Sequence, residues 1–266
     1  NGLEIALTTH GLKDKKKFRE NLLKVIERGL PKRDALAALT TIPAKLAGVA
    51  DQLGTIEVGK LANLVVVEGD YFNPKAKLKG VWIEGRRTTF EPEKLTWIDK
   101  KKEEEKNGEK EDDKKEDKPD ARLARSPIGE HNVLEPAAVL IRNATLWTSS
   151  KRGVLKKHDL LITDGKIKKI GRALQQPDNA HVIDAKGKHV TAGLIDAHNH
   201  SMILGGVNEG TLPSSAMVSI GDVVNSESPE IHRQLAGGLT VANLLHGSAN
   251  PIGGQNAIIR LRLGQG

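Results

Sequence analysis

The chain has 266 residues, a formal net charge of +7 and no cysteine. The lack of cysteine excludes disulfides and thiolate ligands, so any metal site has to use histidine and carboxylate side chains. No apolar run reaches the ~20 residues that span a bilayer, and seven aromatic residues are too few for the base-stacking surfaces of nucleic-acid-binding proteins. We therefore expect no membrane and no nucleic-acid partner, while the compartment, cytoplasmic or periplasmic, stays open.

Two helices are predicted in the first 50 residues. Residues 13–29 carry apolar side chains at helical spacing, and Gly29 is a typical C-terminal stop. The apolar positions are Phe18, Leu22, Val25 and Ile26. A second helix is predicted to start at Pro31 and to end near Ile42 and Pro43. Its inward-facing residues are Leu36 and Leu39.

Two strands and a highly charged segment follow. Residues 61–68 and 80–84 are rich in aliphatic side chains, and Glu84-Gly85 suits a turn after the second strand. In residues 99–118, 18 of 20 residues are charged. Such a segment buries nothing that would offset the ~1–2 kcal/mol per residue cost of ordering its backbone. We expect a charged, disordered linker over residues 91–136.

Short β-prone segments dominate residues 137–192. Asp164-Gly165 is a strong signal for a two-residue hairpin turn between two of them. The expected strands are residues 139–147, 160–163, 166–170, 182–183 and 189–190.

The apolar run from Val190 to Ala197 ends in two histidines, His198 and His200. On a strand both imidazoles leave the same side and Asn199 faces away, which suits two nitrogen ligands for one metal ion. Two histidines at this spacing also occur by chance on strands. A metal site is favoured by the position of the pair at the end of a buried strand, where α/β barrels place catalytic groups.

These segments carry a family resemblance. Residues 138–200, with VLIRNATLWT, DLLITDGKIKKIG and VIDAKGKHVTAGLIDAHNH, resemble the opening of an amidohydrolase-superfamily metallohydrolase. AGGLTVANLLHGSANPIGGQNAIIRLR is similar to the second barrel strand and loop of the imidazolonepropionase-like branch. The resemblance implies that His198 and His200 bind one or two divalent ions, with zinc the expected metal.

Residues 1–90 resemble the closing end of the same family, through ALTTHG, ALAALTTIPAKLAGV and LGTIEVGKLANLVVVEGD. A closing end followed by an opening end predicts an excerpt from a longer protein with two such units in tandem. The expected fold is α/β, with partial (β/α)8 barrel pieces and a small composite β-sandwich. We also expect strands within residues 54–90 and 138–191 to share a sheet.

The predicted organisation has five parts. A closing strand and helices of the first barrel come first, then β-sandwich strands of the first unit, the linker, β-sandwich strands of the second unit, and opening strands of the second barrel. In that order the parts are residues 1–50, 51–90, 91–136, 137–192 and 193–266.

The resemblance implies a metal-dependent hydrolase that cleaves a C–N bond of a small cyclic amide, amidine or peptide-like substrate by metal-activated water. At the family's usual aspartate position, the chain has Thr8 and Thr9 leading into His10, a degenerate metal position of the first unit. The catalytic acid or base is therefore unknown. His246, at the end of the second barrel strand, is a candidate substrate-side residue. We expect residues 1–266 alone to be inactive.

One alternative is a non-catalytic amidohydrolase-like protein that serves binding or assembly. The oligomeric state stays open in both cases.

Overall fold

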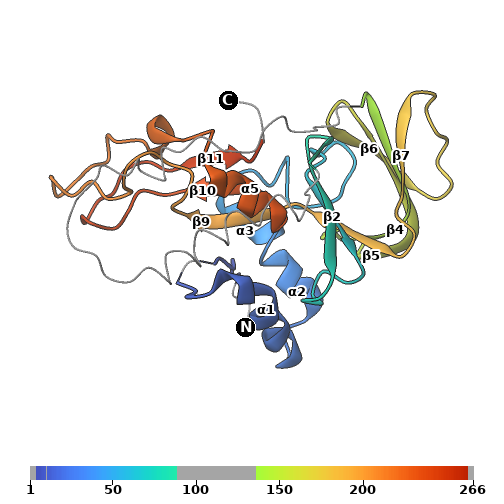
Figure 1. The fold of residues 1–266 in the computed structure, drawn as a ribbon, viewed down its shortest axis with the longest axis horizontal. Coiled ribbons are helices and arrows are strands. Elements are labelled where there is room, and N and C mark those ends of the chain that lie inside the picture. The colour runs from blue at the N-terminus through green and yellow to red at the C-terminus, as the bar shows by residue number, and fades with distance from the viewer. Residues whose placement is uncertain (1–3, 10, 89–135, 263–266) are drawn as a thin grey trace, which may run out of the picture.

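The structure is a computed structural model that describes residues 4–9, 11–88 and 136–262 (Figure 1). His10 and nearly all of the predicted linker, residues 91–135, lie outside the described residues. The predictions made for them are therefore untested. None of the described helices is long and apolar enough to cross a membrane.

The N-terminal helices match the predicted pattern with two corrections. The helix α1 (Phe18–Glu27) ends before Gly29, whose φ is +112°, as predicted. Val25, however, is 47% exposed and lies off the buried side. The second predicted helix is in fact two, α2 (Lys32–Ala37) and α3 (Thr41–Leu46). Pro43 lies in the first turn of α3, where a missing N–H breaks no helical hydrogen bond, so it does not end a helix.

The N-terminal and later β segments form one eight-stranded sheet. Its strand order is β3-β2-β1-β8-β4-β5-β6, with β7 beside β4. The strands are β1 (Leu64–Glu68), β2 (Lys77–Ile83), β3 (Arg86–Thr88), β4 (Ala138–Trp147), β5 (Val154–Thr163), β6 (Lys166–Gly171), β7 (Ala180–Asp184) and β8 (Lys188–Ala192). β1 pairs antiparallel with β8, from Leu64 opposite Ala192 to Glu68 opposite Lys188. The expectation that the two segments share a sheet is confirmed.

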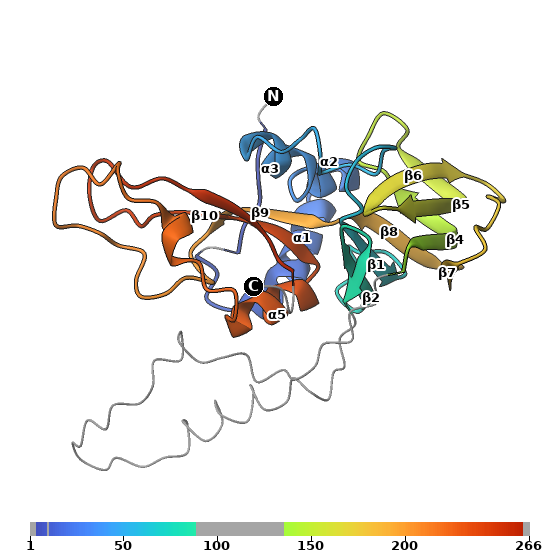
Figure 2. The same ribbon diagram turned by 90° about the horizontal axis from the view of Figure 1, so that it is seen from above.

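This sheet folds over onto itself instead of lying flat. An isolated bridge pairs Lys166, the first residue of β6, with Leu61, which lies just before β1 in the sequence. The last strand of the order thus lies next to the segment that leads into β1. Side chains from both ends of the strand order, such as Trp82 of β2 and Ile167 of β6, lie in one buried cluster. The sheet thus encloses a core of its own, seen as the curled group of strands in Figure 2.

The two predicted turns form as the sequence indicates. Both central residues have positive φ in Glu84-Gly85 (50° and 77°) and in Asp164-Gly165 (50° and 71°). This backbone matches the right-handed twist of the flanking strands. The two turns also touch each other, since a Cβ placed on Gly165 would lie 2.9 Å from the carbonyl oxygen of Glu84.

A second, three-stranded sheet carries the chain beyond residue 193 (Figure 1). It contains β9 (Leu194–Asn199), β10 (Leu239–Leu244) and β11 (Ala257–Arg260), with a short 3-10 helix η3 (Ile220–Val223) and the helix α5 (Pro229–Ala236) between β9 and β10. β9 and β10 are parallel, as the helical crossover between them requires. β11 runs antiparallel to β10, because the loop between them contains no helix to return the chain.

A closed barrel stays a prediction. In the described part of the chain, the barrel-like strands are limited to this three-stranded sheet. The strand expected around Leu7 does not form over residues 4–9. The amide of Leu7 donates to the carbonyl of Ala38, which lies after a helix, so the segment follows α2 and joins no sheet ladder.

Candidate metal centre

The two histidines of the sequence motif converge at the end of β9. Nε2 of His198 and Nε2 of His200 lie 2.9 Å apart, and the ring planes are nearly perpendicular at 78°. Two nitrogens bound to one tetrahedral Zn²⁺ at ~2.0–2.1 Å would lie about 3.3 Å apart. A small widening of the observed separation would therefore place both nitrogens at ligand distance from one ion.

The backbone fixes the protonation pattern of His200. Its Nδ1 lies 3.0 Å from the carbonyl oxygen of Leu245. A carbonyl oxygen only accepts, so Nδ1 carries a hydrogen, and in the neutral ring Nε2 is then the acceptor. This is the tautomer that a metal-ligating histidine needs, with its second nitrogen oriented by a backbone acceptor.

A bulge, and not a regular strand, brings the two rings together. Along the β9 and β10 ladder, Ala242 lies opposite Asp196 but Leu244 lies opposite Asn199, so β9 has one extra residue there. Bulges of this kind redirect side chains at the ends of strands. The sequence predicts regular alternation of side chains along this strand. The strand is irregular there, yet the two histidine side chains still lie on the same side of it.

A polar network holds the turn that carries the histidines. The side-chain amide of Asn199 donates to Asp196 and to Gln234 of α5, each at 3.1 Å. Its carbonyl oxygen accepts from the amide of Ser201 at 2.8 Å. Asp196 also accepts from the backbone amide of His198 at 3.1 Å. Through Gln234, Asn199 anchors the strand end to α5.

The N-terminal segment supports the same strand. Thr8 donates its hydroxyl to the carbonyl of His198 at 3.2 Å. The amide of Ile195 donates to the carbonyl of Leu39 at 2.9 Å. β9 is therefore held along one edge by residues that precede it by more than 150 positions.

In the described ranges, no group of three or more histidine, aspartate or glutamate side chains is placed to hold a metal ion. His246, the candidate substrate-side residue, belongs to a separate polar cluster. Its Nδ1 contacts the carbonyl of Gly247 at 2.6 Å, and its Nε2 lies 3.4 Å from the hydroxyl of Ser215. A role for His246 toward substrate stays a prediction.

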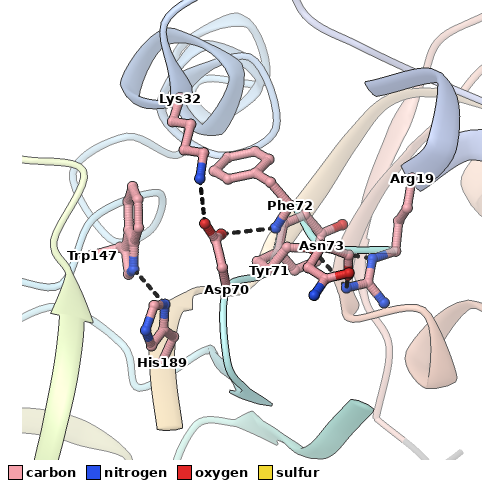
Figure 3. A network of polar contacts seen from close by, with 8 residues as sticks. All are labelled: Arg19, Lys32, Asp70, Tyr71, Phe72, Asn73, Trp147 and His189. Carbon is pink, nitrogen blue, oxygen red and sulfur yellow. Dashed lines mark hydrogen bonds and ion pairs between the residues drawn. The ribbon is translucent and has the colours of Figure 1, made fainter. Parts of the chain in front are cut away.

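Two histidines outside the candidate pair are wholly or partly buried. His232 is 7% exposed on α5. His189 of β8 accepts a hydrogen bond at Nδ1 from the indole of Trp147 at 3.0 Å, as Figure 3 shows. Burial lowers the pKa of His189, with nearby Asp70 acting in the opposite direction and Lys32 in the same direction.

Next to Trp147 and His189, a second network connects α1 to the loop after β1 (Figure 3). Arg19 of α1 donates to the backbone carbonyls of Tyr71, Asn73 and Ala76 at 2.6–3.2 Å. Its guanidinium lies 5.1 Å from the centre of the Tyr71 ring. Burial raises the pKa of Tyr71 to about 12, so the phenol stays neutral at physiological pH. The network is structural, because it links α1 to the sheet away from the histidine pair.

Comparison with known proteins shows that part of the chain is similar to amidohydrolases. Residues 5–88 match the Amidohydrolase family. A dihydroorotase from Halalkalibacterium halodurans is 45% identical over 73 residues, which is 27% of this chain and 16% of the relative. Amidohydrolase tasK from Hapsidospora irregularis is 31% identical over 150 residues, covering 47% of this chain and 15% of the relative. The chain thus spans about a sixth of the length of these relatives.

One solved structure also matches part of the chain in sequence. The crystal structure of an amidohydrolase from Thermotoga maritima MSB8 is 37% identical, with a TM-score of 0.43, and the match covers 47% of this chain and 34% of the other.

Proposed function

We propose that the chain is part of a metal-dependent hydrolase that cleaves C–N bonds, and that His198 and His200 are two of its metal ligands. The proposal rests on one observation above others, the convergence of the two Nε2 atoms to 2.9 Å. The hydrogen bond from Nδ1 of His200 to Leu245 supports it, because this bond leaves Nε2 as an acceptor. The sequence match of residues 5–88 supports the class of reaction.

The donor set fits a divalent ion of borderline softness such as zinc, since imidazole nitrogens are among its preferred ligands. A metal ion bound there would lower the pKa of a coordinated water and polarise the substrate carbonyl. The chain's own part is to fix the two rings. Asp196 and Asn199 hold the backbone of the turn, and Gln234 ties that turn to α5.

A cyclic amide is the substrate class that we favour, because several relatives are named dihydroorotases. We retain the imidazolonepropionase-like branch as a finer assignment, on the residues after Ala236 that resemble it. The order of the pieces, with a closing end before an opening end, supports a tandem of two amidohydrolase units.

Zinc titration of the purified protein tests the ligand assignment. We expect His198→Ala and His200→Ala each to remove measurable binding, since each removes one of two nitrogens. His181→Ala is the matched control, because His181 lies on β7 in the other sheet and is partly exposed. Equal zinc stoichiometry and affinity in all four proteins would eliminate the proposed site and favour the non-catalytic alternative.

Dihydroorotate is a suitable probe for activity. We expect little or no turnover from the 266-residue chain with zinc present, because the described residues bring together no group of three side chains that could hold the ion. Zinc-dependent hydrolysis that disappears in His198→Ala would show that this chain is active by itself.

A further inference from the structure

The described chain consists of two halves, an N-terminal half (residues 4–9 and 11–88) and a C-terminal half (residues 136–262). They are joined through 47 residues of sequence. The halves meet along the β1 and β8 ladder, which continues as backbone hydrogen bonds beyond it. Three of these bonds are 2.8 Å long and run from Ile56 to Thr148, from Gly59 to Ile167 and from Ala62 to Gly165.

Each of the four buried clusters of the described structure contains side chains from both halves. In one, Leu64 and Trp82 pack with Leu146, Leu160 and Val190. The other three show the same division. They combine Val81 and Ile83 with Leu235 and Leu244, Leu36 and Phe72 with Leu194, and Ala44 and Leu53 with Ile195 and Val241. Each half alone would expose these apolar side chains to water, which strongly favours their association.

Ion pairs also join the two halves. Glu84, at the turn of the N-terminal half, forms ion pairs with Arg260 and Arg262 of the C-terminal half, and its side chain is only 14% exposed. The turns at Glu84 and Gly165 also contact each other closely across the two halves. The contact is therefore extended, apolar at its centre and ion-paired at its edge.

We propose that the two halves are a self-complementing pair, so that the protein stays assembled after the covalent link between them is cut. The partner that fits the exposed core and the β8 edge of the C-terminal half is the N-terminal half of the same chain. The recognition elements are the β1 strand, the apolar faces of α2 and α3, and Glu84. This inference does not depend on metal binding or on hydrolysis.

A cut in the intact protein tests the proposal. A protease recognition sequence is inserted between Asn107 and Gly108, and the folded protein is cleaved until a denaturing gel shows two pieces. We expect size-exclusion chromatography with light scattering to show one species near the 28.8 kDa of the uncut chain. The thermal midpoint of the cut protein, but not of the uncut protein, should rise with protein concentration, because unfolding then separates two molecules.

Two glycine variants probe the contact itself. Gly165→Ala places a methyl group 2.9 Å from the Glu84 carbonyl, across the two halves. Gly187→Ala is the control, since its φ of +74° matches the +71° of Gly165 but nothing lies within 4 Å of the added atom. We expect Gly165→Ala to weaken association of the cut pieces at least about tenfold more than Gly187→Ala does.

Three results would overturn the proposal. The first is separation of the wild-type pieces under native conditions. The second is an uncut protein of twice the expected mass, which would place the pairing between two copies. The third is equal association of the two glycine variants, which would show that the turn contact is not part of the interface.

Discussion

Gly193 is the single residue between β8 and β9, and it offers a sharp test of how the histidine-bearing strand is packed. A Cβ on Gly193 would lie 2.3 Å from Oγ1, 2.5 Å from Cγ2 and 2.9 Å from Cβ of Thr240. Thr240 is fully buried, and its hydroxyl donates to the carbonyl of Leu194 at 3.2 Å. Rotation of the threonine cannot relieve the clash, because both branches and the Cβ itself are too close.

We expect Gly193→Ala to destabilise the protein by about 3 kcal/mol, at the upper end of typical overpacking costs. With a urea slope of about 3 kcal/mol/M, the unfolding midpoint should fall by roughly 1 M. Gly206→Ala is the control, since an added Cβ there meets nothing within 4 Å. It should shift the free energy of unfolding by less than about 0.5 kcal/mol.

The double variant Gly193→Ala/Thr240→Ala separates this clash from other causes. Removal of both γ atoms of Thr240 leaves room for most of the new methyl group. The losses of unfolding free energy in the two single variants should therefore not add. The double variant should be about 1–2 kcal/mol more stable than their sum predicts. An unchanged midpoint for Gly193→Ala, or strict additivity in the double variant, would refute the packing described for the start of β9.

Two further predictions concern the network of Figure 3. Arg19→Met should lower the free energy of unfolding in urea by about 2 kcal/mol, because three backbone carbonyls lose a charged donor. Arg33→Met, at a side chain that is 87% exposed, is the control and should have almost no effect. Equal losses of unfolding free energy in the two variants would contradict this prediction. Burial lowers the pKa of His189, so the unfolded chain takes up a proton first as the pH falls below ~6.5, and stability present above that pH is lost. The urea midpoint should therefore fall less between pH 7.5 and pH 5.5 in His189→Gln than in the wild type, and an equal or larger fall in the variant would show that His189 does not contribute.

Features encoded by neighbouring residues could be predicted from the sequence. The Asp164-Gly165 turn is one, because two adjacent residues with positive φ suffice to define it. A sheet shared by strands within residues 54–90 and 138–191 could also be predicted, but through a family resemblance and not through a local pattern, and the particular pairing of β1 with β8 could not. The histidine pair was visible because its two members are separated by one residue.

Features that depend on distant contacts could not be predicted in this way. The bulge in β9 arises from its fit to β10, which lies some 40 residues later. The role of Gln234 in holding Asn199 depends on how α5 packs, and nothing in the sequence around Gln234 indicates it.

One glycine separates a strand fixed on both edges from the strand that bears the imidazoles. β8 is clamped between β1 and β4, and the chain continues from it through Gly193 directly into β9. The direction of the two rings therefore depends on how β8 is held in the eight-stranded sheet.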